Sequence, residues 1–173
     1  MNRGSENLNT HHLDTIDIEE MTEKHVARAV KLVLSVFDSL VAPDCSAEGI
    51  DEFRSFVNVP SMKARLRDGN IMLVAREGRK LVGVIEIRSK NHISLFFVAP
   101  SHQRRGIARA LFQRAVALSR SRHKHITQIT VNAALKAVVA YKALGFTPIS
   151  GIMNQNGITY RPMAHTIPPH LGR

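Results

Sequence analysis

A short basic loop in the middle of the chain carries residue types that suit the binding of a phosphate group. It reads Gln103-Arg104-Arg105-Gly106-Ile107-Ala108 and leads into a helical apolar pattern. A helix N-terminus exposes unpaired N–H groups and the positive end of a dipole, and a glycine lets a ligand approach the backbone closely. Because arginine adds charge-assisted contacts, the loop indicates a site for an anionic group.

The distribution of charge along the chain supports an anionic ligand. The chain has 24 Lys and Arg against 14 Asp and Glu, a net charge of +10. Residues 1–86 hold 11 basic and 14 acidic side chains, whereas residues 87–173 hold 13 basic and none acidic. Nucleic acid, a phosphorylated cofactor and an anionic membrane surface all suit the basic half, and charge alone does not choose among them. Any catalytic carboxylate must come from the first half, which ends at Glu86.

Length and composition predict one ordinary globular domain. We expect residues 1–12 to be a flexible N-terminal segment, residues 13–165 the single domain and residues 166–173 a C-terminal tail. Hydrophobic residues make up 44% and charged residues 22%, which excludes a disordered or fibrous chain. No apolar run reaches the roughly 18 residues of a membrane span, and the polar start lacks a secretory signal. With one cysteine, Cys45, and histidines that lack a ligand spacing, we expect a cytoplasmic protein without a metal site.

The first half of the chain reads as an antiparallel meander with three helices. A strand within residues 13–21 precedes a helix from Glu23 to before Pro43, and two shorter helices follow, one over residues 48–57 and one before Asp68. Residues 70–76 and 80–88 then form strands joined by a turn at Glu77-Gly78-Arg79, and residues 92–98 form a third strand.

The second half changes from strand periodicity to helix periodicity and back. A helix over residues 107–122 and a strand over residues 126–131 continue the strand 92–98 as a right-handed crossover, which makes the two strands parallel neighbours. A helix over residues 138–144 ends at Gly145, and a hairpin turns at Asn156-Gly157. The fold class is therefore α/β (α+β), with a mixed, mostly antiparallel central sheet, a parallel β-α-β crossover and helices on both faces.

Three motifs in this order resemble the GNAT superfamily of acyl-CoA N-acyltransferases. They are Leu95-Phe96-Phe97-Val98-Ala99-Pro100, the basic loop, and Tyr141-x-x-x-Gly145-Phe146. The resemblance covers nearly the whole chain. It implies acetyl-CoA as cosubstrate, with the pyrophosphate on the loop and the pantetheine where the two parallel strands splay apart.

The resemblance also implies which residues contact the cofactor. Phe97 and Val98 would contact the pantetheine and the thioester, and Asn132 would reach the cofactor from the next strand. Ala108 replaces the glycine more usual in the family and is small enough to permit the contact. The pyrophosphate would lie on Gln103, Arg104, Arg105, Gly106, Ile107, Ala108 and Arg109.

The reaction implied is direct attack of a primary amine on the acetyl thioester. By its position in the family motif, Tyr141 is the proton donor to the leaving thiolate, or else a half-buried tyrosine with its hydroxyl in water. The N–H of Val98, if unpaired, would polarise the thioester carbonyl.

The base is His92, Glu86 or ordered water. Strand alternation places His92 on one face with Ser94, Phe96 and Val98, and histidine titrates in the useful range. Its structural alternative is a hydrogen bond to a neighbouring loop. For Glu86, the structural alternative is a surface carboxylate paired to Arg88 or Arg76.

Three functions remain open from the sequence. The first is an acetyltransferase acting on an amine of a small molecule, peptide or protein. The second is a nucleic-acid-binding protein that uses the basic residues of the second half, which lack interleaved stacking aromatics. The third is a CoA-binding protein of this fold with little catalysis. A homodimer is a family expectation, and no membrane partner is expected.

Overall fold

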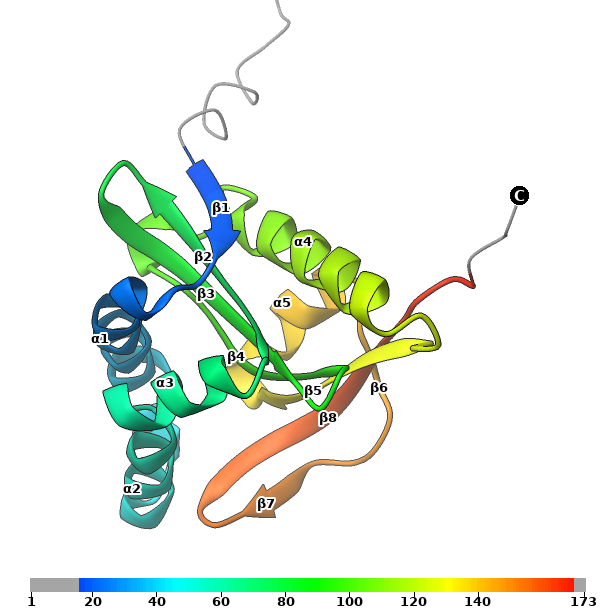
Figure 1. The fold of residues 1–173 in the computed structure, drawn as a ribbon. Helices are drawn as coiled ribbons and strands as arrows, with labels where there is room; N and C mark the ends of the chain where they lie inside the picture. The colour runs from blue at the N-terminus through cyan, green and yellow to red at the C-terminus, as the bar shows by residue number, and fades with distance from the viewer. Residues whose placement is uncertain (1–15, 170–173) are drawn as a thin grey trace, which may run out of the picture.

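The computed structural model describes residues 16–169. The expected flexible segment 1–12, the expected start of the first strand at residue 13 and the tail residues 170–173 lie outside this range. Within it, one eight-stranded sheet has helices on both faces (Figure 1). The strands are β1 (Ile16–Glu20), β2 (Ile71–Glu77), β3 (Lys80–Arg88), β4 (His92–Val98), β5 (Gln128–Ala134), β6 (Thr147–Pro148), β7 (Met153–Gln155) and β8 (Ile158–Thr166).

The strand order confirms the predicted fold class. The strands lie in the order β1-β2-β3-β4-β5-β8-β6, with β7 paired to β8. Every neighbouring pair is antiparallel except β4 and β5, which are parallel. The parallel pair is joined by the crossover helix α4, as the change of periodicity predicts.

Two groups of helices cover the two faces of the sheet. One face carries α1, α2 and α3, and the other carries α4 and α5 (Figure 1). These helices are α1 (Glu23–Leu40), α2 (Ala47–Phe56), α3 (Val59–Arg67), α4 (Ile107–Arg122) and α5 (Val138–Ala143), and short 3-10 turns lie at Ala42–Asp44, Pro100–His102 and Leu135–Ala137.

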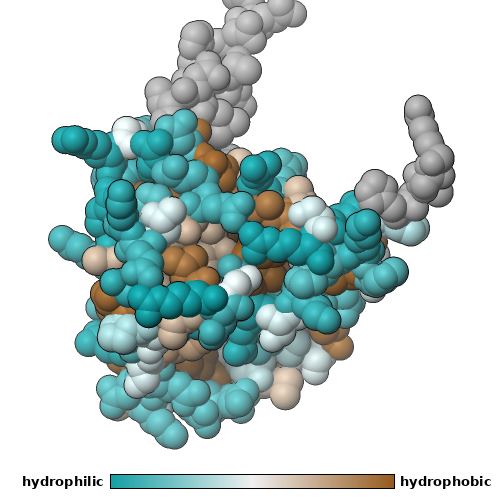
Figure 2. All heavy atoms as spheres, viewed as in Figure 1, coloured by the Kyte–Doolittle hydropathy of each residue, from teal (hydrophilic) through white to brown (hydrophobic). Residues whose placement is uncertain are grey.

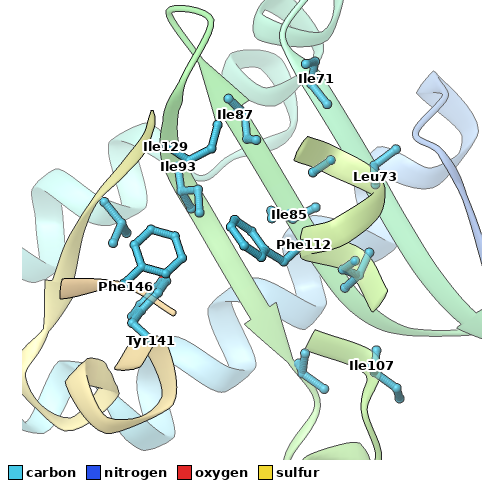
Figure 3. Close-up of a cluster of buried hydrophobic side chains, with 14 of the residues drawn as sticks. Ile71, Leu73, Ile85, Ile87, Ile93, Ile107, Phe112, Ile129, Tyr141 and Phe146 are labelled. Carbon is cyan, nitrogen blue, oxygen red and sulfur yellow. The ribbon is translucent and has the colours of Figure 1, made fainter. Parts of the chain in front are cut away.

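Each face of the sheet has its own hydrophobic core. On the α1 side, Val26, Val33 and Met62 are fully buried with Leu95 of β4. On the α4 side, Ile107, Leu111 and Phe112 pack with Tyr141 and Phe146 over the central strands (Figure 3). Burial of these apolar stripes is the main force that fixes the helices on the sheet.

A glycine of β3 allows α4 to lie close to the sheet. A Cβ atom at Gly83 would stand 2.8 Å from Leu111 Cδ1, closer than carbon atoms pack. This close approach sets the height of α4 above the sheet. The start of α4, which carries the basic loop, is therefore fixed relative to β4.

The observed elements differ from the predicted ones at a few boundaries. Glu77 is the last residue of β2 rather than part of the turn, and β5 extends to Ala134. The predicted final hairpin limb is divided into β6 and β7, and the segment between them leaves Ile149 and Ile152 exposed.

Candidate active site

The central feature of the site is an opening between β4 and β5. The two strands pair only at His92 with Thr130 and at Ile93 with Val131, although β4 runs on to Val98 and β5 to Ala134. Past Ile93, the facing backbone groups of the two strands no longer meet. A sheet normally satisfies these groups, so the opening offers hydrogen-bond donors and acceptors to an extended ligand.

Backbone alternation directs the N–H of Val98 into this opening. The N–H of Ala99 bonds the carbonyl of Val82 on β3 at 2.8 Å, and Val98 pairs with Gly83 in the same register. Because successive N–H groups point to opposite sides of a strand, that of Val98 points away from β3 and toward the opening. The carbonyl of Val98 accepts a hydrogen bond from Gln103 Nε2 at 3.1 Å.

The basic loop forms a left-handed turn before α4. Arg104 has φ +61° and Gly106, the N-cap of α4, has φ +80°. No side chain caps the helix, and its first turn holds no acidic residue. The first N–H groups of any helix have no intrahelical acceptor, and in α4 no side chain takes that place. This arrangement binds phosphate oxygens in other proteins.

The three arginines around the loop lie in different environments. Arg104 is exposed, while Arg105 turns back and donates from Nη2 to Glu77 Oε1 at 3.0 Å. Arg109 donates from Nη2 to the carbonyl of Ala143, the last residue of α5, at 3.0 Å. The backbone of the loop is thus open, whereas the side chain of Arg105 is held by a carboxylate.

Tyr141 stands on α5, on the α4 side of the opening. Its ring makes an edge contact with Phe146, at a centroid distance of 5.2 Å (Figure 3). A second edge contact joins it to Phe96 of β4, at 6.1 Å. The side chain is buried, and this burial raises the pKa of the Tyr141 hydroxyl well above its ordinary value of 10. The hydroxyl therefore remains protonated at neutral pH and can act as an acid but not as a base.

An irregularity in β4 moves His92 to the other face of the sheet. Leu95 pairs with Glu86 and Ile93 pairs with Ile87, so Ser94 is an extra residue without a partner on β3. Such a bulge breaks the alternation of side chains. The expectation that His92 shares a face with Phe96 and Val98 is therefore wrong: Ile93 joins the α4-side core with them, and His92 points to the α1 side.

His92 is partly buried and held by a neighbouring strand. Its Nδ1 atom lies 2.8 Å from Thr130 Oγ1 on β5, in place of the loop contact considered from the sequence. Burial, and to a smaller degree the charge of Arg88, lower the pKa of His92 below its usual 6.5. The imidazole is therefore neutral at neutral pH, the form that can accept a proton.

Glu86 is fully buried in an ion pair on the α1 side. Its Oε1 accepts from Arg65 Nε and Asn70 Nδ2, both at 2.8 Å, and its Oε2 accepts from Arg65 Nη2 at 3.3 Å. The partner is thus Arg65 of α3, and the surface pairing with Arg88 or Arg76 is wrong. A carboxylate with both oxygens engaged in a buried pair is typical of a structural role.

The two remaining predicted contacts lie on the α1 side or outside the core. The ring of Phe97 packs near Phe53 of α2, with centroids 5.9 Å apart, on the face opposite Tyr141. Asn132 is exposed on β5 and alternates with Val131 and Ala133, which join the α4-side core.

The segment that begins α2 touches the turn between β7 and β8. The N–H of Ser46, at the start of α2, donates to the carbonyl of Gly157 at 3.1 Å, in the turn between β7 and β8. Gly49 packs directly against the same turn, since a Cβ there would stand 2.8 Å from Gly157 O.

No helix in residues 16–169 is long and apolar enough to cross a membrane. Over the same residues, no group of three His, Cys, Asp or Glu side chains is arranged to hold a metal ion.

Comparison with known proteins identifies the family. A family model described as an acetyltransferase (GNAT) domain matches residues 41–167, well over half of the chain. The chain belongs to the GNAT acetyltransferases. This confirms the resemblance seen in the three motifs, although no curated protein sequence matches the chain.

Solved GNAT structures share this fold. A GCN5-related N-acetyltransferase from Rhodopseudomonas palustris superimposes with a TM-score of 0.75 at 20% identity, covering 88% of this chain and 96% of that one. PaiA N-acetyltransferase from Thermoplasma acidophilum, solved in complex with coenzyme A, gives 0.70 at 16% identity, covering 88% and 99%. A GNAT acetyltransferase from Staphylococcus aureus gives 0.67 at 14% identity, covering 87% and 98%.

Several residues of this GNAT site have no signal in the sequence. Ser94, at the bulge, has a buried hydroxyl without a hydrogen-bond partner among residues 16–169. Glu77 and His102 contact each other behind the loop at 3.0 Å, from positions 25 residues apart. Pairings between distant segments of this kind depend on the register of the strands, which single-sequence patterns do not specify.

Proposed function

We propose that this GNAT chain transfers an acetyl group from acetyl-CoA to a primary amine of a small molecule, peptide or protein. The observation that carries the proposal is the opening between β4 and β5, which lies next to Tyr141 and the start of α4. A diphosphate on the first N–H groups of α4 would leave the pantetheine arm to extend into the opening. There its amides would meet backbone groups such as those of Val98.

Loop residues would hold the cofactor mainly through their backbone. Gly106, Ile107, Ala108 and Arg109 supply the N–H groups at the start of α4. The exposed Arg104 adds charge, while Gln103 fixes the loop to Val98. Phe97 and Asn132 are assigned a lesser part, because their side chains face the α1 side or solvent.

The amine nitrogen would attack the thioester carbonyl carbon, the C–S bond would break, and the sulfur would need a proton. Tyr141 is the proposed donor, since its buried hydroxyl stays protonated. Its raised pKa makes it a weak acid, but the same burial would raise the pKa of the leaving thiol. The N–H of Val98 would stabilise the charge on the carbonyl oxygen.

The proton of the attacking amine would leave on the α1 side of the sheet, opposite Tyr141. His92 is neutral and lies on the α1 side, which suits an acceptor amine entering from that face while the cofactor is held on the α4 side. Ordered water is the other candidate base. Glu86 is not favoured, because Arg65 and Asn70 occupy its carboxylate.

The proposal is tested by calorimetric titration with coenzyme A followed by an amine screen that detects free thiol from acetyl-CoA. We expect binding of coenzyme A and thiol release with at least one primary amine. A structure with coenzyme A bound should place its diphosphate at the start of α4. Absence of binding, or a cofactor located elsewhere, would refute the assignment. Binding without thiol release on any amine would favour a CoA-binding protein with little catalysis.

Binding of nucleic acid is the less favoured function. In one view of the molecule, hydrophilic residues cover most of the surface and hydrophobic ones lie scattered between them (Figure 2). Several basic residues of the second half are already engaged: Arg105 with Glu77, Arg122 with Glu20 and Lys136 with Asp44. Salt-sensitive RNA binding without binding of coenzyme A would support this function instead.

A further inference from the structure

A single carboxylate behind the basic loop holds residues on both sides of its turn. Glu77 Oε2 lies 3.0 Å from His102 Nε2, and Glu77 Oε1 accepts from Arg105 Nη2 at 3.0 Å. Gln103 and Arg104 lie between these two contacts. Glu77 itself belongs to β2, where it pairs with Ile16 of β1 and Lys80 of β3. The loop is thus attached to the sheet at two points by one side chain.

Both partners of Glu77 are turned inward and are themselves restrained. The His102 residue is only 6% exposed, and its second ring nitrogen, Nδ1, lies 2.7 Å from Ser101 Oγ. The side chain of Arg105 is 25% exposed, and its Nε atom is buried without a hydrogen-bond partner in the described part of the chain. An arginine in a loop could extend into water, so its inward position indicates that the contact with Glu77 orders it.

The backbone between the two contacts needs such restraint. Arg104 has φ +61°, in the left-handed region that residues with a side chain rarely adopt. Left to itself, this turn would relax to other conformations, and the N–H groups at the start of α4 would lose their common orientation. Between the two contacts of Glu77, one further side chain holds the turn in the described part of the chain: Gln103 donates a hydrogen bond to the carbonyl of Val98.

We propose that Glu77 is a positioning residue for the cofactor: its carboxylate clasps His102 and Arg105 and so orders the loop backbone for a diphosphate. This inference rests on the proposed function. A ligand that binds an ordered loop does not have to order it, so affinity is higher than for a free loop. Hydrogen bonds from His102 and Arg105 lower the pKa of the Glu77 carboxyl, which keeps it ionised at neutral pH.

The assignment differs from the family expectation for Arg105. That expectation makes Arg105 a contact of the pyrophosphate; because Glu77 binds the Arg105 side chain, Glu77 would then compete with the cofactor for it. If instead the Glu77 clasp, meaning its contacts with His102 and Arg105, orders the loop, then Arg105 acts through the backbone and Glu77 strengthens binding of the cofactor. The two roles predict opposite effects when the carboxylate is removed.

The test compares Glu77→Gln with a matched control, Glu19→Gln. Glu19 is also a strand residue paired to an arginine, at 2.6 Å from Arg76 Nε, and its side chain is 40% exposed against 37% for Glu77. For Glu77→Gln we expect the Kd for coenzyme A and the KM for acetyl-CoA to rise about tenfold, with kcat within about twofold of wild type. Amide hydrogen exchange should become faster at residues 103–106. Glu19→Gln should change none of these values.

The outcomes separate this inference from the proposed function. A wild-type protein that does not bind coenzyme A refutes the proposed function itself. If wild type binds and Glu77→Gln binds equally well, the clasp is refuted, even where the variant is less thermostable. Tighter binding by Glu77→Gln would also overturn it, because Arg105 would then be a phosphate ligand restrained by Glu77. Should Glu77→Gln not fold, His102→Gln releases the loop from its other side and must raise the Kd by a similar factor.

Discussion

Replacement of Tyr141 by phenylalanine removes the proposed acid and little else. Phenylalanine keeps the ring, and with it the edge contacts to Phe96 and Phe146 at 6.1 and 5.2 Å. No hydrogen bond within residues 16–169 involves the tyrosine hydroxyl, so its loss leaves no protein group unpaired there. We expect the free energy of unfolding to change by less than about 1 kcal/mol.

The rate of acetyl transfer should fall much more than stability. General acid catalysis contributes about 100-fold or more, so kcat for Tyr141→Phe should drop ~100-fold, equivalent to about 2.7 kcal/mol of transition-state stabilisation. The Kd for coenzyme A should stay within about threefold of wild type, because the diphosphate contacts at α4 are unchanged. The assay is single-turnover thiol release from acetyl-CoA with a saturating amine, alongside calorimetric binding and chemical denaturation.

The other tyrosine provides the control for removing a buried hydroxyl. Tyr160 is as buried as Tyr141, and its hydroxyl donates to Gln155 Oε1 at 3.4 Å. Tyr160→Phe loses this hydrogen bond and should therefore cost at least as much stability as Tyr141→Phe, while its affinity for coenzyme A and its rate of thiol release should stay close to wild type. Unchanged thiol release by Tyr141→Phe at pH 7 would show that another group, or water, protonates the sulfur, and the acid assignment would be wrong.

Three further outcomes are expected. The lowered pKa of His92 means that the folded state favours the neutral imidazole, so its contribution to stability is fully present above about pH 6.5 and is lost as pH falls through the folded-state pKa. The thermal midpoint of wild type should therefore fall more steeply below pH 6.5 than that of His92→Gln. Parallel curves for the two proteins would contradict this. Glu86→Gln should lower the unfolding free energy by about 3–5 kcal/mol by leaving Arg65 buried without its counter-charge; a loss below about 1 kcal/mol in urea denaturation would be inconsistent with that pair. Gly157→Ala would place a Cβ 1.8 Å from Ser46 Oγ at φ +78°, so the thermal midpoint should fall; an unchanged midpoint would contradict the close packing of this turn against the start of α2.

Local chemistry allowed much of the fold to be predicted. The apolar stripe of α4, the glycine at its start and the helix-ending Gly145 are short-range signals, and the structure places α4 and α5 where these signals predict them. The parallel pairing of β4 with β5 follows from the handedness of the crossover. These features depend on residues a few positions apart, which is why a single sequence specifies them.

The errors arise where distant strands set the local geometry. One unpaired residue, Ser94, moves His92 to the opposite face, and strand alternation cannot reveal a bulge whose register is fixed by β3. Similarly, Glu86 finds its partner Arg65 on α3, 21 residues earlier, rather than beside it on the sheet. The order of residues 103–108 indicated a basic loop, but it could not show whether an arginine side chain in that loop faces a ligand or Glu77.

The opening between β4 and β5 also divides the sheet mechanically. The meander β1–β4 and the group β5, β8, β6 and β7 are joined across the sheet by only two residue pairs. When no ligand fills this opening, the two halves of the sheet are free to twist against each other. An extended molecule bound in the opening would act as a missing strand. Saturation at about 100 times Kd should then stiffen the whole sheet and add about 2.7 kcal/mol to its resistance to unfolding.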